Sequence, residues 1–173
     1  MSSVNPYESF LDGRPVEEIL NATANEIATL LAKIGVEGSA VRPAPGKWSA
    51  AEIVCHLADC EMVFGFRLRQ TLAEDGPTIQ PFDQEKWAAV YPGIGAGQAL
   101  GVFSSLRRWN LRLIQNALPA AAARPVYHPE RGSMTFQTIV DTMAGHDLNH
   151  LGQLQRIAAE AGSKSSFEPT KLP

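Results

Sequence analysis

The chain of 173 residues has no apolar run that approaches the ~20 residues of a membrane-spanning helix. It also has no block of basic residues, since 15 lysines and arginines stand against 18 acidic residues for a net charge of −3. The lack of a long apolar run argues against a membrane-spanning protein. The lack of a basic block argues against nucleic acid or an acidic membrane surface as the main partner.

Cysteine is scarce, and its two positions do not suggest a disulfide. Cys55 and Cys60 fall in one expected helix, where five residues of separation put them about 140° apart around the axis. Free thiols suit a reducing compartment. Residues 1–6 lack the basic start and apolar run of a signal peptide. We therefore expect a cytoplasmic protein.

The composition, 45% hydrophobic and 19% charged, is that of a folded chain. Its length fits one domain over residues 1–173, with a core at about residues 15–160. Residues 163–173 are expected to be loosely attached, as chain ends often are.

Four segments carry apolar residues at helical spacing, and together they predict an all-α four-helix bundle. They cover residues 15–34, 49–72, 99–118 and 135–161. Pro15 and Gly35 bound the first, a Ser49–Glu52 capping box opens the second, and Thr135 is the expected cap of the fourth. The connections are longer than an alternating bundle needs, so the connectivity stays open. Residues 83–90 are a candidate short helix, and residues 125–128 a candidate extended segment.

Two histidines, His146 and His150, stand one helical turn apart in the fourth segment. They share an apolar stripe with Ile139, Met143 and Leu154, so their imidazoles face the interior. An interior imidazole needs a hydrogen-bond partner or a metal, because unpaired burial costs about 1–3 kcal/mol.

A third histidine, His56, lies on the inner side of the second segment. Three imidazoles converging from two helices would form an open metal site, whereas histidines satisfied by hydrogen bonds within the core are the alternative. His128 lies among prolines without a partner at helical spacing, and we predict it at the surface.

Two motifs resemble those of the DinB-like superfamily (DinB/YfiT-like metalloenzymes). Residues 48–59, WSAAEIVCHLAD, are similar to its first metal-binding helix, and residues 145–154, GHDLNHLGQL, to its second. The resemblance spans about residues 15–160. It implies a four-helix bundle with a divalent metal held by His56, His146 and His150, and often a homodimer. The superfamily includes thiol-dependent S-transferases, isomerases and proteins described as metal-dependent hydrolases.

Three histidine ligands leave positions open to water or substrate, which is typical of catalytic sites. Imidazole suits zinc, nickel, iron and copper; zinc and nickel are our first choices. The leading interpretation is a metal-dependent enzyme, an S-transferase using a low-molecular-weight thiol or a hydrolase, acting on a small-molecule substrate. The alternatives are a non-catalytic metal-binding or stress-related protein, and a bundle without metal.

Further side chains have open roles around this site. Asp59 would orient a ligand or act as a base, or be merely solvated; Cys60 would be a fourth ligand or a small core residue. Asp147 points away from His146 and is expected to make packing contacts or a hydrogen bond to another helix. Asn149 and Gln153 would line the site.

A buried arginine near the metal would hold a substrate carboxylate with two hydrogen bonds. The candidates are Arg67, Arg107 and Arg108, and solvated side chains are the alternative. Trp87 and Tyr91, in the loop of residues 75–97, would cover the open side of the metal or simply cap the core.

Overall fold

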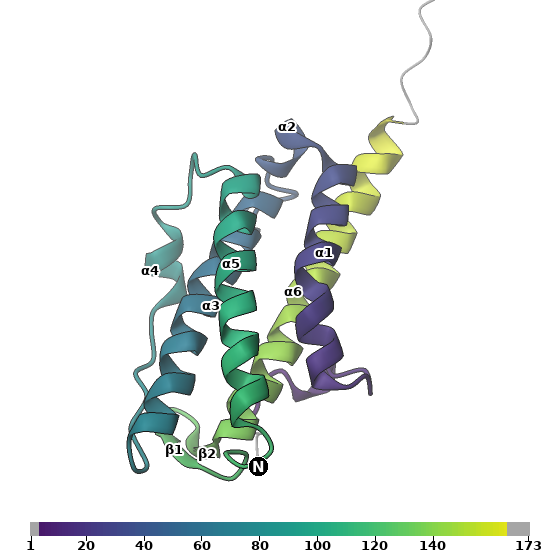
Figure 1. The fold of residues 1–173 in the computed structure, drawn as a ribbon. Helices are drawn as coiled ribbons and strands as arrows, with labels where there is room; N and C mark the ends of the chain where they lie inside the picture. The colour runs from purple at the N-terminus through teal and green to yellow at the C-terminus, as the bar shows by residue number, and fades with distance from the viewer. Residues whose placement is uncertain (1–3, 166–173) are drawn as a thin grey trace, which may run out of the picture.

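The computed structural model describes residues 4–165 and confirms the four-helix bundle. Its long helices are α1 (Val16–Ile34), α3 (Ala50–Ala73), α5 (Ala96–Ala117) and α6 (Phe136–Ser165) (Figure 1). The shorter elements are η1 (Glu8–Phe10), α2 (Val36–Ser39), α4 (Gln84–Ala88), β1 (Pro125–His128) and β2 (Gly132–Thr135). Within the described residues, no helix is long and apolar enough to cross a membrane.

The helices do not alternate in direction around the bundle. In Figure 1, α1 and α6 run upwards, whereas α3 and α5 run downwards. The packed pairs are α1 with α6 and α3 with α5, both parallel, and α3 with α6 and α1 with α5, both antiparallel. A parallel neighbour requires the chain to return along the bundle. The segment between α3 and α5, which carries α4, makes this return.

The local signals for helix ends are confirmed. The hydroxyl of Ser49 accepts from the Glu52 N–H at 3.2 Å, and the Glu52 carboxylate accepts from the Ser49 N–H at 2.8 Å. Gly35 ends α1 with a φ of 78°. The predicted end of the fourth helix at residue 161 is wrong, because α6 continues through residues 163–165. The loose attachment of the tail stays a prediction, and residues 166–173 lie outside the described part.

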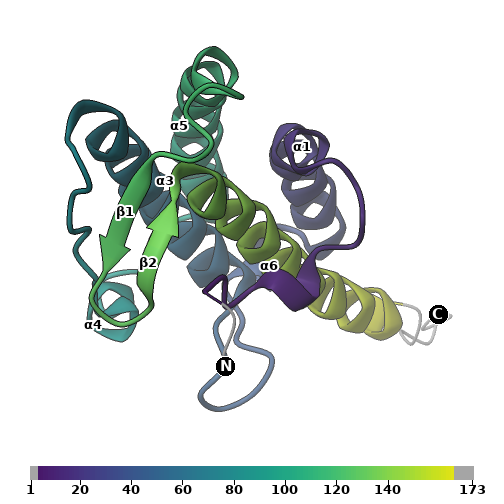
Figure 2. The same cartoon turned by 90° about the horizontal axis from the view of Figure 1, so that it is seen from below.

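A two-stranded hairpin closes the lower end of the bundle (Figure 2). The sequence indicated β1 but not its partner β2, which pairs Val126 with Met134. Side chains alternate along a strand, so Val126 and His128 share the buried face. The prediction of a surface His128 is therefore wrong, since only 2% of it is exposed.

The core consists of two apolar clusters separated by a polar layer. In α1, Ile19 and Leu20 belong to the lower cluster and Ile27 to the upper one. Eight of the buried polar residues lie at or near the boundary between the clusters, and every long helix contributes to them: Thr23, His56, Glu61, Arg107, Asn110, His146, Asp147 and His150. The candidate site lies in this layer.

Candidate metal centre

The structure brings the three predicted histidines together. His56 comes from the second turn of α3, and His146 and His150 come from the middle of α6. One ring nitrogen from each lies within 4.8 Å of the others, and all three side chains are buried. No other group of three metal-binding side chains occurs in the described residues.

The spacing of one pair of these nitrogens fits two ligands of a single metal ion. Nε2 of His56 lies 3.1 Å from Nε2 of His146. Two nitrogens bound tetrahedrally to one zinc at 2.0–2.1 Å would be about 3.3–3.4 Å apart. The observed separation therefore matches that of two ligands of one ion.

A hydrogen bond orients the third ring. Nδ1 of His150 lies 3.1 Å from Oε1 of Gln153, one turn further along α6. An amide oxygen only accepts, so Nδ1 carries the proton and Nε2 keeps its lone pair. Such bonds to the outer nitrogen commonly fix metal-binding histidines. The sequence suggested that Gln153 lines the site, and the structure gives it this more specific contact.

The three imidazoles are neutral at ordinary pH. Burial, together with the charge of the neighbouring His150, lowers the pKa of His56 to about 3. Burial also lowers the pKa of His146 and of His150; for His146, repulsion from the other two histidines adds to the effect. A metal ligand must be unprotonated, and this environment supplies that state.

Aromatic rings from three segments surround the histidines. The Trp48 ring lies 4.9 Å from His56, and Tyr7 presents its ring to His146 at 5.1 Å. Phe64 lies 5.9 Å from His146 on the side of the lower cluster. Tyr7 comes from the start of the chain, and no pattern in the sequence indicated it.

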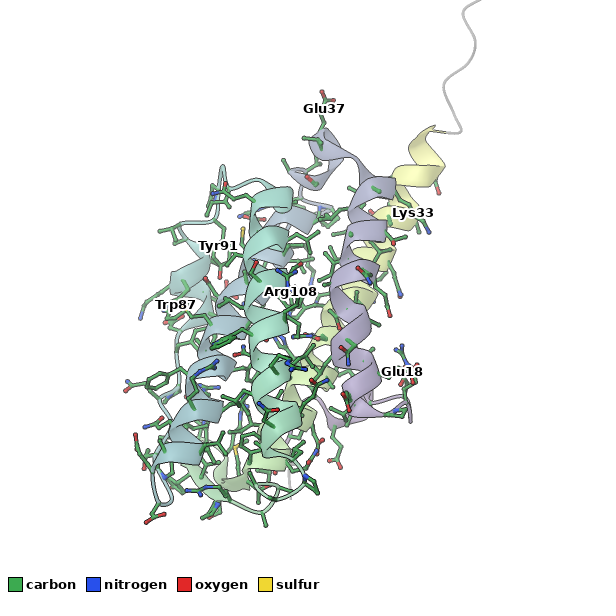
Figure 3. All side chains as sticks on the ribbon, viewed as in Figure 1. Glu18, Lys33, Glu37, Trp87, Tyr91 and Arg108 are labelled. Atoms are coloured by element: carbon green, nitrogen blue, oxygen red, sulfur yellow. The ribbon has the colours of Figure 1, made fainter. Side chains whose placement is uncertain are left out.

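Of the two roles expected for Trp87 and Tyr91, the structure supports capping of the core for Tyr91, which belongs to the upper apolar cluster and packs near Trp48. Both lie on the α4 side of the bundle (Figure 3). The Trp87 ring packs against Phe82 at 4.7 Å. The Tyr91 hydroxyl donates to Asp59 at 2.7 Å, so that carboxylate contacts a phenol instead of a ligand histidine.

Cys60 lies against one ring of the site. Its Sγ is 3.5 Å from Nε2 of His56, but the convergent donors in the described residues are the three histidines alone. Burial raises the pKa of this thiol, and Cys60 also belongs to the lower apolar cluster. It therefore behaves as a small core residue.

Arg107 is neither solvated nor available to a substrate. Its guanidinium donates to Asp147 at 2.6 and 3.1 Å and to Glu61 at 2.7 Å. Thr23 also donates to Asp147, at 2.8 Å, and Asn110 donates to Glu61 at 2.9 Å. The network joins all four long helices beside the histidines. It confirms that Asp147 bonds other helices.

The site has an opening next to His150. A cavity of 570 Å³ lies there, between α6, the loop before α3 and α4. Its lining combines charged, amide and apolar side chains: Tyr7, Lys47, Trp48, Glu85, Asn149, His150, Gln153, Arg156 and Ile157. A small molecule entering this cavity would meet His150 first.

Comparison with known proteins identifies the family. The family model described as the DinB superfamily matches residues 19–154. The chain belongs to the DinB superfamily. The match includes both histidine-bearing helices, so the resemblance drawn from the two motifs is confirmed.

Individual relatives of this DinB-superfamily chain carry names that refer to metal. A protein of Oceanobacillus iheyensis named "putative metal-dependent hydrolase" is 26% identical over 163 residues, which cover 89% of this chain and 95% of that protein. A Bacillus mycoides protein with the same description is 26% identical over 110 residues, 63% of this chain and 64% of its own length.

A solved structure shares the fold. YfiT from Bacillus subtilis, described as a probable metal-dependent hydrolase with an unusual four-helix bundle topology, superposes with a TM-score of 0.78. The two chains are 18% identical, and the superposition covers 85% of this one and 86% of YfiT. The paired parallel helices therefore occur in both proteins.

Proposed function

We propose that this chain is a metal-dependent enzyme in which His56, His146 and His150 hold one divalent ion. The observation that carries the proposal is the convergence of three buried, neutral imidazoles at the edge of a cavity. The names of the relatives support a metal-dependent activity. Zinc and nickel are the metals we expect, since imidazole suits both.

A divalent ion bound there would supply Lewis-acid chemistry to water or to a substrate thiol. The protein supplies the rest. Gln153 holds His150 in one tautomer, and Trp48 and Tyr7 shield the rings from bulk water. The Arg107 network fixes α6 relative to α3 and α5. The cavity admits a small molecule on the His150 side.

Hydrolysis is the reaction that the relatives' names support. Transfer to a low-molecular-weight thiol is the second candidate, and a feature of the site favours it. The buried or half-buried acids nearest the histidines already have partners: Asp59 accepts from Tyr91, whereas Glu61 and Asp147 accept from Arg107. A thiol ionises far more readily than water, so thiol transfer depends less on a general base.

Metal content tests the proposal. We would measure bound metal by elemental mass spectrometry in the wild type, His150→Ala and His128→Ala after loading with zinc or nickel. His128 is a matched control because it is also a buried imidazole but lies outside the cluster. We expect about one ion per chain in the wild type and in His128→Ala, and almost none in His150→Ala. Equal metal content in all three would refute the assignment.

Turnover separates the two reactions. The zinc- or nickel-loaded protein would be assayed against ester and amide substrates without thiol, and against electrophiles with a small thiol. Thiol-independent turnover that His150→Ala abolishes would establish the hydrolase. Turnover only with thiol would establish the transferase. A homodimer and a cytoplasmic location stay predictions from the sequence.

A further inference from the structure

Arg67 is a buried cation with an unused hydrogen-bond donor. It lies on α3 with 7% of its surface exposed. Its Nη2 donates to the carbonyl of Gln80 at 2.6 Å, but its buried Nε has no partner among the described residues. A buried polar group without a partner usually has a function or a missing ligand.

No carboxylate of the described chain forms an ion pair with Arg67. The ion pairs among the described residues involve other cations: Arg14, Arg42, Lys86, Arg107 and Arg124. The Nε of Arg107 also lacks a partner in the described part of the chain, but its guanidinium differs in contacting two carboxylates. A buried charge without a paired counterion is costly, and the nearby Glu130 acts on Arg67 only at a distance, without forming an ion pair.

The groups next to Arg67 increase this imbalance. Burial and the positive charge of Arg131, in the turn of the hairpin, lower the pKa of Arg67, and they outweigh the opposite effects of Cys60 and Glu130. His128 is also buried, and burial together with the charges of Arg131 and Arg67 lowers its pKa. Its Nδ1 accepts from the Glu130 N–H at 3.2 Å, so its Nε2 is left as a donor.

The Arg131 N–H donates to the His128 carbonyl at 3.1 Å. The N–H of Ile79, next to Gln80, donates to the Tyr127 carbonyl at 2.9 Å. These contacts bring the two arginines and the imidazole donor to the same end of the bundle.

This place lies on the hairpin side of the three-histidine centre. Arg67 comes eleven residues after His56, on nearly the same face of α3 but about 16 Å further along the axis. Helix side chains point towards the N-terminus, and the charge of Arg67 acts on Cys60. The charge of Arg131 acts on His146. The cationic group therefore lies at the hairpin end of the centre.

Three arginines were candidates for binding a substrate carboxylate, and in the structure only Arg67 of these three is both buried and without an ion pair among the described residues. Arg107 is held by Glu61 and Asp147, and Arg108 is exposed on α5. A guanidinium presents several N–H donors in one plane, which suits the two oxygens of a carboxylate.

We propose that Arg67 and Arg131, with His128, form an oxyanion site beside the three-histidine centre, and that it receives a carboxylate of the small-molecule substrate. Its use as a substrate subsite rests on the proposed function. Its capacity to bind an anion does not, because the arginines come from α3 and the hairpin and need no metal.

The test measures anion binding by the full chain before and after a chelator removes bound metal. Thermal unfolding would be followed while succinate, acetate or inorganic phosphate replaces chloride at constant ionic strength. The variants are Arg67→Met, Arg131→Gln and, as a control, Arg108→Met. We expect saturable stabilisation of the metal-free wild type by the carboxylates. Binding should be at least about tenfold weaker in Arg67→Met and Arg131→Gln, and unchanged in Arg108→Met.

Three outcomes would overturn the proposal. The first is the absence of saturable stabilisation by any carboxylate. The second is equal stabilisation of the wild type and both site variants. The third is a response to phosphate alone, which would exclude a carboxylate as the ligand. Arg131 is a half-buried turn residue, so we expect Arg131→Gln to fold. If Arg67→Met does not fold, anion binding by Arg131→Gln tests the proposal. Anion binding by a chain that takes up no metal would uphold this site and refute the proposed enzyme.

Discussion

Nδ1 of His150 donates to the side-chain oxygen of Gln153 at 3.1 Å, and this contact determines which ring nitrogen of His150 is free. The two residues are three positions apart on α6, so the bond depends on the helix alone. It prepares His150 for a ligand without any contribution from the other helices.

Replacing Gln153 by leucine should weaken metal binding without unfolding the protein. The His150 ring would lose its orienting acceptor, and such changes cost about 10- to 100-fold in metal affinity. Competition with a chromophoric chelator measures the dissociation constant. Gln155→Leu is the control, since Gln155 is exposed on the same helix. Equal affinities in the two variants would contradict the role of Gln153.

Replacing Arg107 by leucine should destabilise the whole bundle. Burial alone would lower the pKa of Arg107, but Asp147 and Glu61 raise it above its ordinary value. Removing the cation leaves two buried carboxylates uncompensated, which should cost about 3–5 kcal/mol of the free energy of unfolding. Urea denaturation of metal-free protein measures this. Arg108→Leu, at an exposed neighbour, should change stability by less than about 0.5 kcal/mol. A similarly small loss in Arg107→Leu would show that the network contributes little.

Acid should destabilise the metal-free protein through its buried histidines. Their pKa values are lowered in the folded state, from 6.5 to about 3 for His56. Below about pH 6.5 the unfolded chain therefore binds protons that the folded chain does not. The free energy of unfolding should be greatest above that pH and fall towards pH 3, by up to about 1.4 kcal/mol per pH unit for each histidine.

Urea denaturation at a series of pH values between about 7.5 and 5 measures this slope. His56→Gln removes one titrating group and should give a shallower dependence than the wild type. A slope that the substitution leaves unchanged would mean that His56 is not a source of the acid sensitivity.

Two glycines of α6 should respond in opposite ways to a methyl group. A Cβ at Gly145 would collide with the carbonyl oxygen of Tyr7, whereas a Cβ at Gly152 meets nothing closer than Arg156 at 3.8 Å. Gly145→Ala should displace Tyr7 from His146, and hydrogen exchange over residues 7–10 should rise. Gly152→Ala should stabilise the helix by about 0.5–1 kcal/mol. Unchanged exchange in Gly145→Ala would refute the close approach.

The sequence predicted the elements whose causes are local. The Ser49 capping box, the Gly35 stop and the four apolar stripes involve residues up to four positions apart, and the structure confirms each of them. The spacing of His146 and His150 placed them on one helix face for the same reason.

Contacts between distant segments depended on the tertiary structure. Helical spacing places Arg107, unlike Arg108, close to the inner stripe of its helix, but it does not reveal the two buried acids that Arg107 contacts. His128 is buried because β2, absent from the sequence prediction, pairs with β1 and turns its alternate side chains inwards.

The chain by itself thus determined its helices, their inner faces and the three histidines, because periodicity and capping depend on neighbours in sequence. The parallel pairing of α1 with α6, the Arg107 network and the cationic group around Arg67 depended on which helix faces meet. Which helix faces meet depends on packing and charge compensation across the whole bundle, and these cannot be predicted from any short segment.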